Sequence, residues 1–165
     1  MIDADTLRSR LDYDPETGEF TWLPTGNPRI DTRLAGKVAG TPRNGYVVIE
    51  VGDDKHYAHR FAWLYMTGEW PANQIDHIDR NRSNNRFANL RPATSLQNKW
   101  NTSRQARSTS GTKGVTWHKR LKRWRAQIRL AGVSRHLGYF DSTDDAAVAY
   151  AAAARVQFGE FASLG

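Results

Sequence analysis

The chain has 165 residues, of which 39% are hydrophobic, enough for one domain or two small ones. Cysteine is absent, which excludes disulfides, thiolate zinc sites and a thiol nucleophile and fits a reducing cytoplasm, the expected location. The net charge is +7, yet residues 1–99 hold 13 basic and 13 acidic side chains, so residues 100–165 carry the whole excess.

The first part of the chain predicts a short helix, a turn and a strand. Residues 3–13 have two leucines one helical turn apart, and this acidic, amphipathic start is unlike a signal peptide. The sequence DPETG at 14–18 predicts a turn, after which Phe20 begins an alternating, strand-like pattern. Residues 24–44 are rich in Pro, Gly and Thr and predict a loop, with one short strand near 37–39.

A hairpin and a helix are expected next. YVVIEV at 46–51 is rich in β-branched residues, a turn at 52–54 follows, and residues 55–59 return as the partner strand. Residues 59–68 have apolar side chains at helical spacing and end at Gly68. No apolar run approaches the roughly 20 residues that a membrane helix needs, so no membrane partner is expected.

Residues 74–101 are unusually rich in Asn, Asp and His. Two short strands, at 75–78 and 90–92, flank a polar loop, and a helix capped by Thr94 or Ser95 follows. Because a buried amide is costly unless its hydrogen bonds are satisfied, this composition indicates turns, a binding site, or both.

Three side chains of this stretch have the chemistry of a metal-dependent phosphodiesterase. Asp76 supplies a carboxylate and Asn98 an amide oxygen for a hard cation such as Mg²⁺, and two protein ligands leave room for water and substrate. His77 has a side chain suited to accepting a proton near neutral pH. Adjacent residues of a regular strand point to opposite faces, so Asp76 and His77 can share a site only if the strand ends or bulges there.

Two other interpretations of the same residues stay open. The asparagines can be turn formers, with His77 a hydrogen-bonded polar residue of no catalytic role. A zinc site formed by His56, His59 and His77 is the other alternative, disfavoured by the lack of cysteine and by the positions of His56 and His59.

The last third of the chain begins with TSRQARSTSGT at 102–112, the best linker in the sequence, which predicts a domain boundary and mobility. Ten Lys and Arg residues and no acid lie between Arg104 and Arg135. Such a concentration of positive charge favours a nucleic-acid partner, so DNA binding is assigned to this third.

Residues 114–118, 123–130 and 133–140 predict a three-stranded antiparallel sheet, and a helix from about Ser142 to Phe158 packs on it. Along the middle strand, apolar residues alternate with Arg123, Arg125, Gln127 and Arg129, which gives one apolar and one basic face. The small alanines of the helix allow close packing on the apolar face. A solvated basic face without a ligand is the alternative.

The central stretch resembles HNH endonucleases of the phage and homing type, through HRFAW, IDHID, NNRFANLRPAT and QN within residues 59–101. LDYDPETGEFTW and GYVVIEV also resemble the N-terminal part of phage HNH proteins. The resemblance implies a ββα-metal motif in which His77 is the general base, Asp76 a metal ligand and Asn89 the residue that braces the loop and positions the base. Asn98 stands where many members have the final metal-binding histidine.

The segment 113–161 resembles the plant Apetala/ethylene-response-factor (ERF) DNA-binding domain, through KGVTW, RWRAQIRL, LGYFDSTDDAAVAYAAAA and FGEFA. In that family the sheet lies in the major groove of DNA. The residues expected to contact DNA are Lys113, Thr116, His118, Arg123, Arg125, Gln127, Arg129, Arg135 and His136. One extra residue in the first turn means that plant target sequences do not transfer.

The expected fold class is α+β. N-terminal strands and short helices lead into the ββα-metal motif, at about 74–101, in a nuclease domain of residues 1–101. A linker at 102–112 and an ERF-type DNA-binding domain at 113–165 follow.

The expected function is site-specific DNA hydrolysis by a phage- or mobile-element-encoded endonuclease that nicks or cuts both strands. Mg²⁺ is the expected cofactor, with Mn²⁺ or another divalent cation as a substitute; double-stranded DNA is the partner, no small-molecule cofactor is expected, and the protein is expected to be a monomer. One alternative is a non-catalytic, sequence-specific DNA-binding regulator with a vestigial nuclease motif. An RNA-binding protein is a weaker alternative, because the sheet displays arginines rather than stacking aromatics.

Overall fold

A computed structural model describes residues 1–101, 110–130 and 132–162. The chain divides into two compact units, Met1–Ser95 and Leu96–Gly165. The first unit thus ends before the predicted domain end at residue 101. Most of the predicted linker, residues 102–109, lies outside the described residues, and so does the mobility expected there. None of the helices in the described part of the chain has the length and apolar character needed to cross a membrane.

The first unit begins with helix α1 (Ala4–Arg10), whose N-terminus is capped by Asp3 accepting a hydrogen bond from the Thr6 backbone N–H at 2.7 Å. The prediction of a helix through residue 13 is wrong at its end. Strand β1 (Leu11–Asp14) starts immediately and pairs antiparallel with β2 (Glu19–Trp22). The helix stops there because residues 11–14, LDYD, alternate apolar and polar side chains with the period of a strand, and these side chains are alternately buried and exposed.

The segment predicted as a loop at 24–44 contains helix α2 (Pro28–Leu34), capped by Asn27. Periodicity did not reveal it because none of its residues is buried. Strand β3 (Thr41–Arg43) pairs with β4 (Tyr46–Val51), which pairs with β5 (Asp54–Tyr57), so the three form an antiparallel sheet. The strand expected near 37–39 is reduced to a single bridge between Val38 and Thr21.

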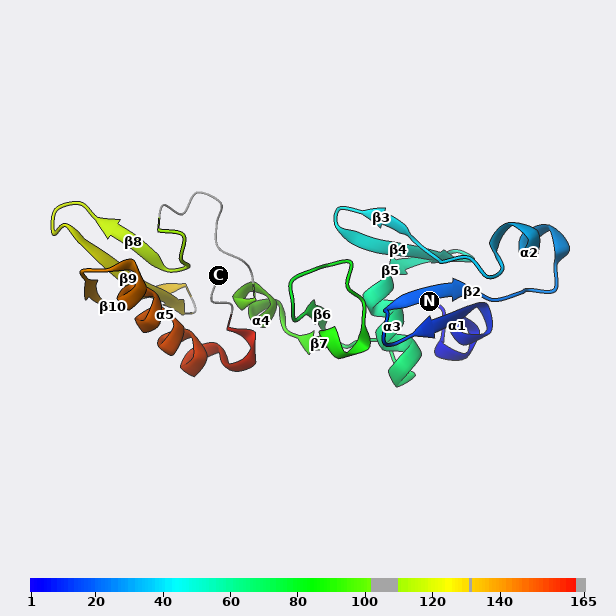
Figure 1. The fold of residues 1–165 in the computed structure, drawn as a ribbon. Coiled ribbons are helices and arrows are strands. Elements are labelled where there is room, and N and C mark those ends of the chain that lie inside the picture. Colours follow the sequence, from blue (N-terminus) through cyan, green and yellow to red (C-terminus); the bar gives the residue numbers. More distant parts are fainter. Residues whose placement is uncertain (102–109, 131, 163–165) are drawn as a thin grey trace. The chain divides into compact units, whose positions relative to one another are not determined.

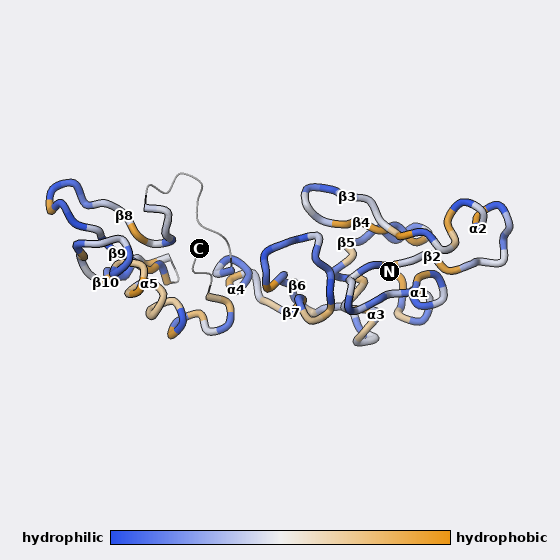
Figure 2. The backbone as a smooth tube through the Cα atoms, viewed as in Figure 1, coloured by the Kyte–Doolittle hydropathy of each residue, from blue (hydrophilic) through white to orange (hydrophobic). Residues whose placement is uncertain are grey.

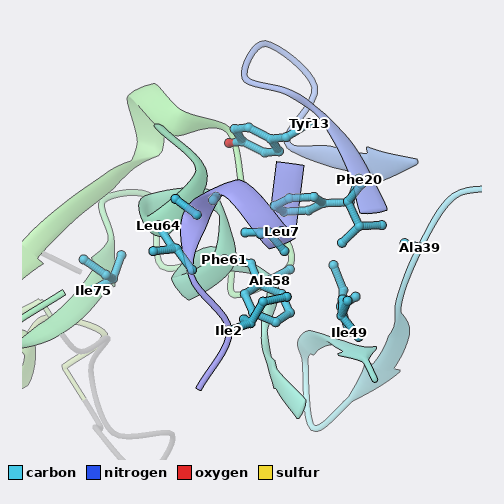
Figure 3. Packing of buried hydrophobic residues seen from close by; sticks show 14 of the residues in the cluster. Ile2, Leu7, Tyr13, Phe20, Ala39, Ile49, Ala58, Phe61, Leu64 and Ile75 are labelled. Atoms are coloured by element: carbon cyan, nitrogen blue, oxygen red, sulfur yellow. The ribbon is translucent and has the colours of Figure 1, made fainter. Parts of the chain in front are cut away.

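Helix α3 (Ala58–Thr67) follows β5 directly and ends at Gly68, which has a φ of 82°. It packs on α1 and on β4. Figure 3 shows the resulting core, in which side chains from α1, the two hairpins and α3 converge. The largest fully buried side chains of this unit are Leu7, Leu11, Phe20, Ile49, Phe61 and Leu64.

The last elements of the first unit are strands β6 (Gln74–His77) and β7 (Leu90–Ala93), paired antiparallel, with a 3-10 turn (Phe87–Asn89) between them. Helix α4 (Ser95–Trp100) follows β7, so the predicted order of strand, loop, strand and helix is present. Beyond Ser95, α4 belongs to the second unit, where Trp100 stacks on Phe158 with ring centroids 4.7 Å apart.

The second unit is built on strands β8 (Val115–His118), β9 (Arg123–Leu130) and β10 (Val133–Phe140), with β9 in the middle of an antiparallel sheet. Helix α5 (Thr143–Phe158) packs on it and leads into a 3-10 turn (Gly159–Phe161). The sheet and helix predicted from the sequence are therefore present (Figure 1). The buried residues between them are Val115, Ala126, Ile128, Ala146, Tyr150, Ala154 and Phe158.

Candidate active site

Strands β6 and β7 position the two central residues of the predicted site. Asp76 pairs with Arg91 and His77 with Leu90, without a register shift. The strand ends at His77, although the Ile78 backbone N–H still donates to the Asn89 carbonyl at 2.9 Å. Of the two geometries that the sequence allowed, a bulge or a strand end, the structure has the strand end. Both Asp76 and His77 are buried.

The carboxylate of Asp76 lies against the guanidinium of Arg91. The Arg91 Nε and one terminal nitrogen both donate to Asp76 Oδ2, at 3.0 and 2.9 Å, and both side chains are buried. A buried carboxylate needs such a partner, because an isolated charge is costly in a low-dielectric interior. Arg91 is not among the site residues expected from the sequence; its only signal is its position directly across from Asp76 once the two strands are paired.

The ring of His77 is held on two sides. Its Nε2 lies 3.3 Å from Asn85 Oδ1, and its ring meets that of His59 edge to face at 4.9 Å. Burial lowers the pKa of His77 below its usual value, although the hydrogen bond to Asn85 and the charges of Asp79 and Asp76 act in the opposite direction. The imidazole is therefore neutral at neutral pH. The Asn85 Oδ1 oxygen can only accept a hydrogen bond, so Nε2 is the nitrogen that carries the proton of the neutral ring.

His59 is the second histidine of the cluster and is only 6% exposed. Burial, together with the charges of His77 and Arg60, lowers its pKa to about 3. Its ring also stacks on Tyr57, with centroids 5.6 Å apart and planes 10° from parallel. From the sequence, His59 is a candidate zinc ligand; the fold shows that it contacts His77.

The alternative zinc site gains no support. His56, its third proposed ligand, packs instead against the rings of Phe61 and Trp70, at 5.4 and 4.5 Å between ring centroids. Within the described residues, no group of three or more His, Asp or Glu side chains is arranged to hold a metal ion. Among the predicted ligands, Asp76 offers a carboxylate, an oxygen ligand of the kind that Mg²⁺ prefers.

The loop between β6 and β7 is hydrophilic (Figure 2) and is cross-linked by its own side chains. Asn89 accepts from the Asp79 backbone N–H at 3.0 Å and donates to Asp79 Oδ1 at 2.9 Å and to the Asn84 carbonyl at 2.8 Å. Burial acts to raise the pKa of Asp79, but hydrogen bonds from Asn84, Asn81 and Asn89 outweigh it and lower the pKa. These contacts span the loop and fix its shape.

The N-terminal hairpin holds this loop from outside. The Tyr13 hydroxyl donates to the Asn85 carbonyl at 2.6 Å, and the Arg86 Nε donates to the Glu16 carbonyl at 2.7 Å. Gly18, at a φ of 78°, lies so close that a Cβ there would be 2.4 Å from backbone atoms of Asn85 and Arg86. Asn85, one of the asparagines that the sequence offers as turn formers, is 3% exposed and faces His77.

The remaining predicted metal ligand, Asn98, lies on α4 in the second unit, and its role as a ligand stays a prediction. In that unit, alternation along the strands places seven of the predicted DNA-contacting residues on the sheet face away from α5. These residues are Thr116, His118, Arg123, Arg125, Gln127, Arg129 and His136.

The two other residues predicted to contact DNA differ. Lys113 donates from Nζ to the Trp100 carbonyl at 2.9 Å, which ties α4 to the segment before β8. Arg135 is in register with Ile128, a buried residue on the helix side of the sheet, and so lies on the opposite side from Gln127. On the sheet face away from α5, Arg123 is engaged by Asp141 through two contacts of 2.7 Å.

Part of the chain is similar to known proteins. Residues 56–99 match the family model described as HNH endonuclease. Protein 3.8 of Escherichia phage T7 is 37% identical over 75 residues, which are 45% of this chain and 62% of that protein. An uncharacterized HNH endonuclease of Acanthamoeba polyphaga mimivirus is 34% identical over 124 residues, 73% of this chain and 63% of that protein.

The chain thus spans less than two thirds of the length of both curated relatives. No solved structure matches it. The matched segment runs from β5 through α3 and the β6–β7 pair into α4, and so contains both histidines of the cluster and Asp76. Residues 56–99 are therefore similar to HNH endonuclease domains.

Proposed function

We propose that the protein is a site-specific DNA endonuclease of the phage or homing type that depends on a divalent cation. The observation that carries the proposal is His77, a buried, neutral imidazole at the end of β6, next to Asp76, inside the segment that matches HNH endonucleases. A histidine with a lowered pKa in a fixed orientation is suited to accept a proton at neutral pH.

In the proposed mechanism, His77 takes a proton from the water that attacks the scissile phosphate. Asn85 and His59 fix the orientation of its ring, and Asn89 fixes the loop that carries Asn85. Asp76 and Asn98 are the proposed ligands of Mg²⁺, with Mn²⁺ as a substitute. A bound divalent cation would stabilise the negative charge that develops on the phosphate and the leaving 3′ oxygen. The expected products carry 5′-phosphate and 3′-hydroxyl ends.

Recognition of the target is assigned to the second unit. The basic sheet face described above presents arginines at alternate positions along β9, and an ERF-type domain would place such a face in the major groove. The Arg123–Asp141 ion pair is exposed, so little free energy is lost when Arg123 leaves Asp141 to contact a DNA phosphate.

The test is cleavage of supercoiled plasmid with Mg²⁺ or with EDTA. The expected result is nicked or linear DNA with Mg²⁺ only, and a His77→Ala rate about 10²–10⁴-fold below that of the unchanged protein. Arg29→Gln, a substitution at an exposed position on α2 outside the cluster, is the control and should retain the rate. Cleavage by His77→Ala at the unchanged rate would remove His77 as the base.

A non-catalytic DNA-binding regulator is the second candidate. The observation that favours it is the Asp76–Arg91 ion pair, because a carboxylate engaged by a buried guanidinium resembles a structural residue. This candidate predicts salt-dependent DNA binding without nicking under any divalent cation tried in the plasmid assay.

A further inference from the structure

The sheet formed by β3, β4 and β5 has one covered and one open face. Along β4, Val47, Ile49 and Val51 alternate with Tyr46, Val48 and Glu50, and Ile49 and Val51 are buried in the core. Cross-strand pairs share a face, so Arg43 joins Tyr46, Tyr57 joins Val48, and Lys55 joins Glu50 on the open side. The open face therefore combines two tyrosines with basic side chains. The three strands lie side by side in Figure 1.

A groove of about 480 Å³ runs along the edge of this face and is basic. Arg43, Lys55 and Arg60 line it together with His56 and Tyr57, and none of the described residues that line it is acidic. Lys55 is neutralised by Glu50 at 2.7 Å. The two arginines differ from it: in the part of the chain that the structure describes, neither guanidinium has a hydrogen bond or an ion pair, and that of Arg60 lies over the ring of Trp70.

The groove leads to the candidate active site through touching rings. Tyr57 lines the groove, is 43% exposed, and stacks on His59, which contacts His77. The Tyr46 and Tyr57 ring centroids are 4.7 Å apart, and the Arg82 guanidinium lies 4.9 Å from the Tyr46 ring. Positive side chains thus lie beside both tyrosines of this cluster, Arg82 at Tyr46 and the groove arginines at Tyr57. Residues 1–99 carry no net charge, so this local excess is not a property of the unit as a whole.

We propose that the groove along this open face, named the β3–β5 groove, is a second DNA-binding surface. It holds the duplex backbone beside the phosphate that His77 acts on. Arg43 and Arg60 would contact phosphates, and the Tyr57 ring would form the wall between the groove and the active site. Guanidinium groups without a hydrogen-bond or ion-pair partner suit phosphate, because they give charge-assisted hydrogen bonds without first breaking an ion pair. The inference rests on the proposed nuclease function and adds to it a surface that the sequence, with all its excess charge in the last third, does not suggest.

The test measures equilibrium binding of the full-length protein to a fluorescent duplex in EDTA, over a range of salt concentrations. Arg43→Gln should reduce the slope of log K against log salt by about 0.9 and weaken binding about fivefold. Arg43→Gln with Arg60→Gln should reduce the slope about twice as much. Arg29→Gln, which removes the same charge from an exposed position on α2, is the matched control and should leave the slope unchanged.

Equal slopes and affinities for Arg43→Gln and Arg29→Gln would overturn the inference, whatever the plasmid assay shows. A reduced slope for Arg43→Gln alone would support it, even if no variant or condition produced cleavage. Because binding is measured without divalent cations and cleavage with them, failure of the nuclease proposal and failure of the second surface give different results.

Discussion

Replacing Gly18 by alanine tests whether the N-terminal hairpin holds the active-site loop in place. Gly18 has a φ of 78°, and a Cβ there would lie 2.4 Å from the Asn85 carbonyl carbon and the Arg86 nitrogen, both backbone atoms. The hairpin and the loop must therefore separate. That movement breaks or stretches two hydrogen bonds, from Arg86 Nε to the Glu16 carbonyl and from the Phe87 N–H to the Pro15 carbonyl.

The expected cost has two parts. An L-residue at this φ costs about 1–2 kcal/mol, partly offset by about 0.4–1 kcal/mol because alanine restricts the unfolded chain. Loss of two hydrogen bonds adds about 1 kcal/mol each. Gly52→Ala is the matched control, because Gly52 has a φ of 61° and a Cβ added there would meet nothing within 4 Å, so only the first part applies.

Urea unfolding of the two variants measures the difference in the free energy of unfolding, provided that the m-value is unchanged. We expect Gly18→Ala to be about 2 kcal/mol less stable than Gly52→Ala. Faster hydrogen exchange of the Phe87 amide in Gly18→Ala alone would locate the effect at the loop. If the two variants lose equal stability and Phe87 stays protected, the hairpin does not brace the loop and the reasoning fails.

Three further predictions concern the residues around His77. Asn85→Ala removes the hydrogen-bond partner of His77 Nε2, so kcat should fall about tenfold in the plasmid assay with DNA affinity unchanged; equal kcat would mean that Asn85 does not orient the ring. The pKa of His59 is about 3 in the folded state and 6.5 in the unfolded state. As the pH falls, the unfolded state therefore binds a proton at a higher pH than the folded state does. The free energy of unfolding should therefore decrease as the pH falls from 6.5 towards 3, by up to about 1.4 kcal/mol per pH unit. Urea unfolding of His59→Phe should show a weaker dependence of this free energy on pH. Arg91→Met leaves the Asp76 carboxylate buried without this guanidinium and should cost about 3–5 kcal/mol in urea unfolding. Adding Asp76→Asn should restore most of that stability, and failure to do so would show that the ion pair is not the cause.

Local patterns predicted much of the fold. The hairpin around Gly52, helix α3 with its stop at Gly68, and the period-two pattern of β9 were all visible because each element contains its own signal. Helix α2 was missed because it buries no residue, so its sequence has no apolar stripe to detect. The end of α1 was misplaced because Leu11 fits the apolar side of a helix and of a strand equally well.

The site shows the same division. Asp76, His77, Asn89 and Asn98 were selected from a short, ordered motif, whereas the neighbours that hold His77 come from elsewhere. The sequence around Asn85 indicates a turn, and only the structure shows its side chain against the His77 ring. His59 lies on helix α3, 18 positions before His77. Contacts of this kind depend on how β6, β7 and α3 pack, which no local pattern encodes.

The brace between the hairpin and the site loop has a consequence for the order of folding. Its hydrogen bonds join residues far apart in the chain, 72 positions for Tyr13 with Asn85 and 70 for Arg86 with Glu16. Contacts of such long sequence separation carry a high loop-closure entropy and form after local hairpins and helices. A ribosome must therefore have released nearly the whole first unit before the loop acquires its final shape. The ring of His77, which Asn85 contacts, is thus held in place only after Asn85 itself has left the ribosome.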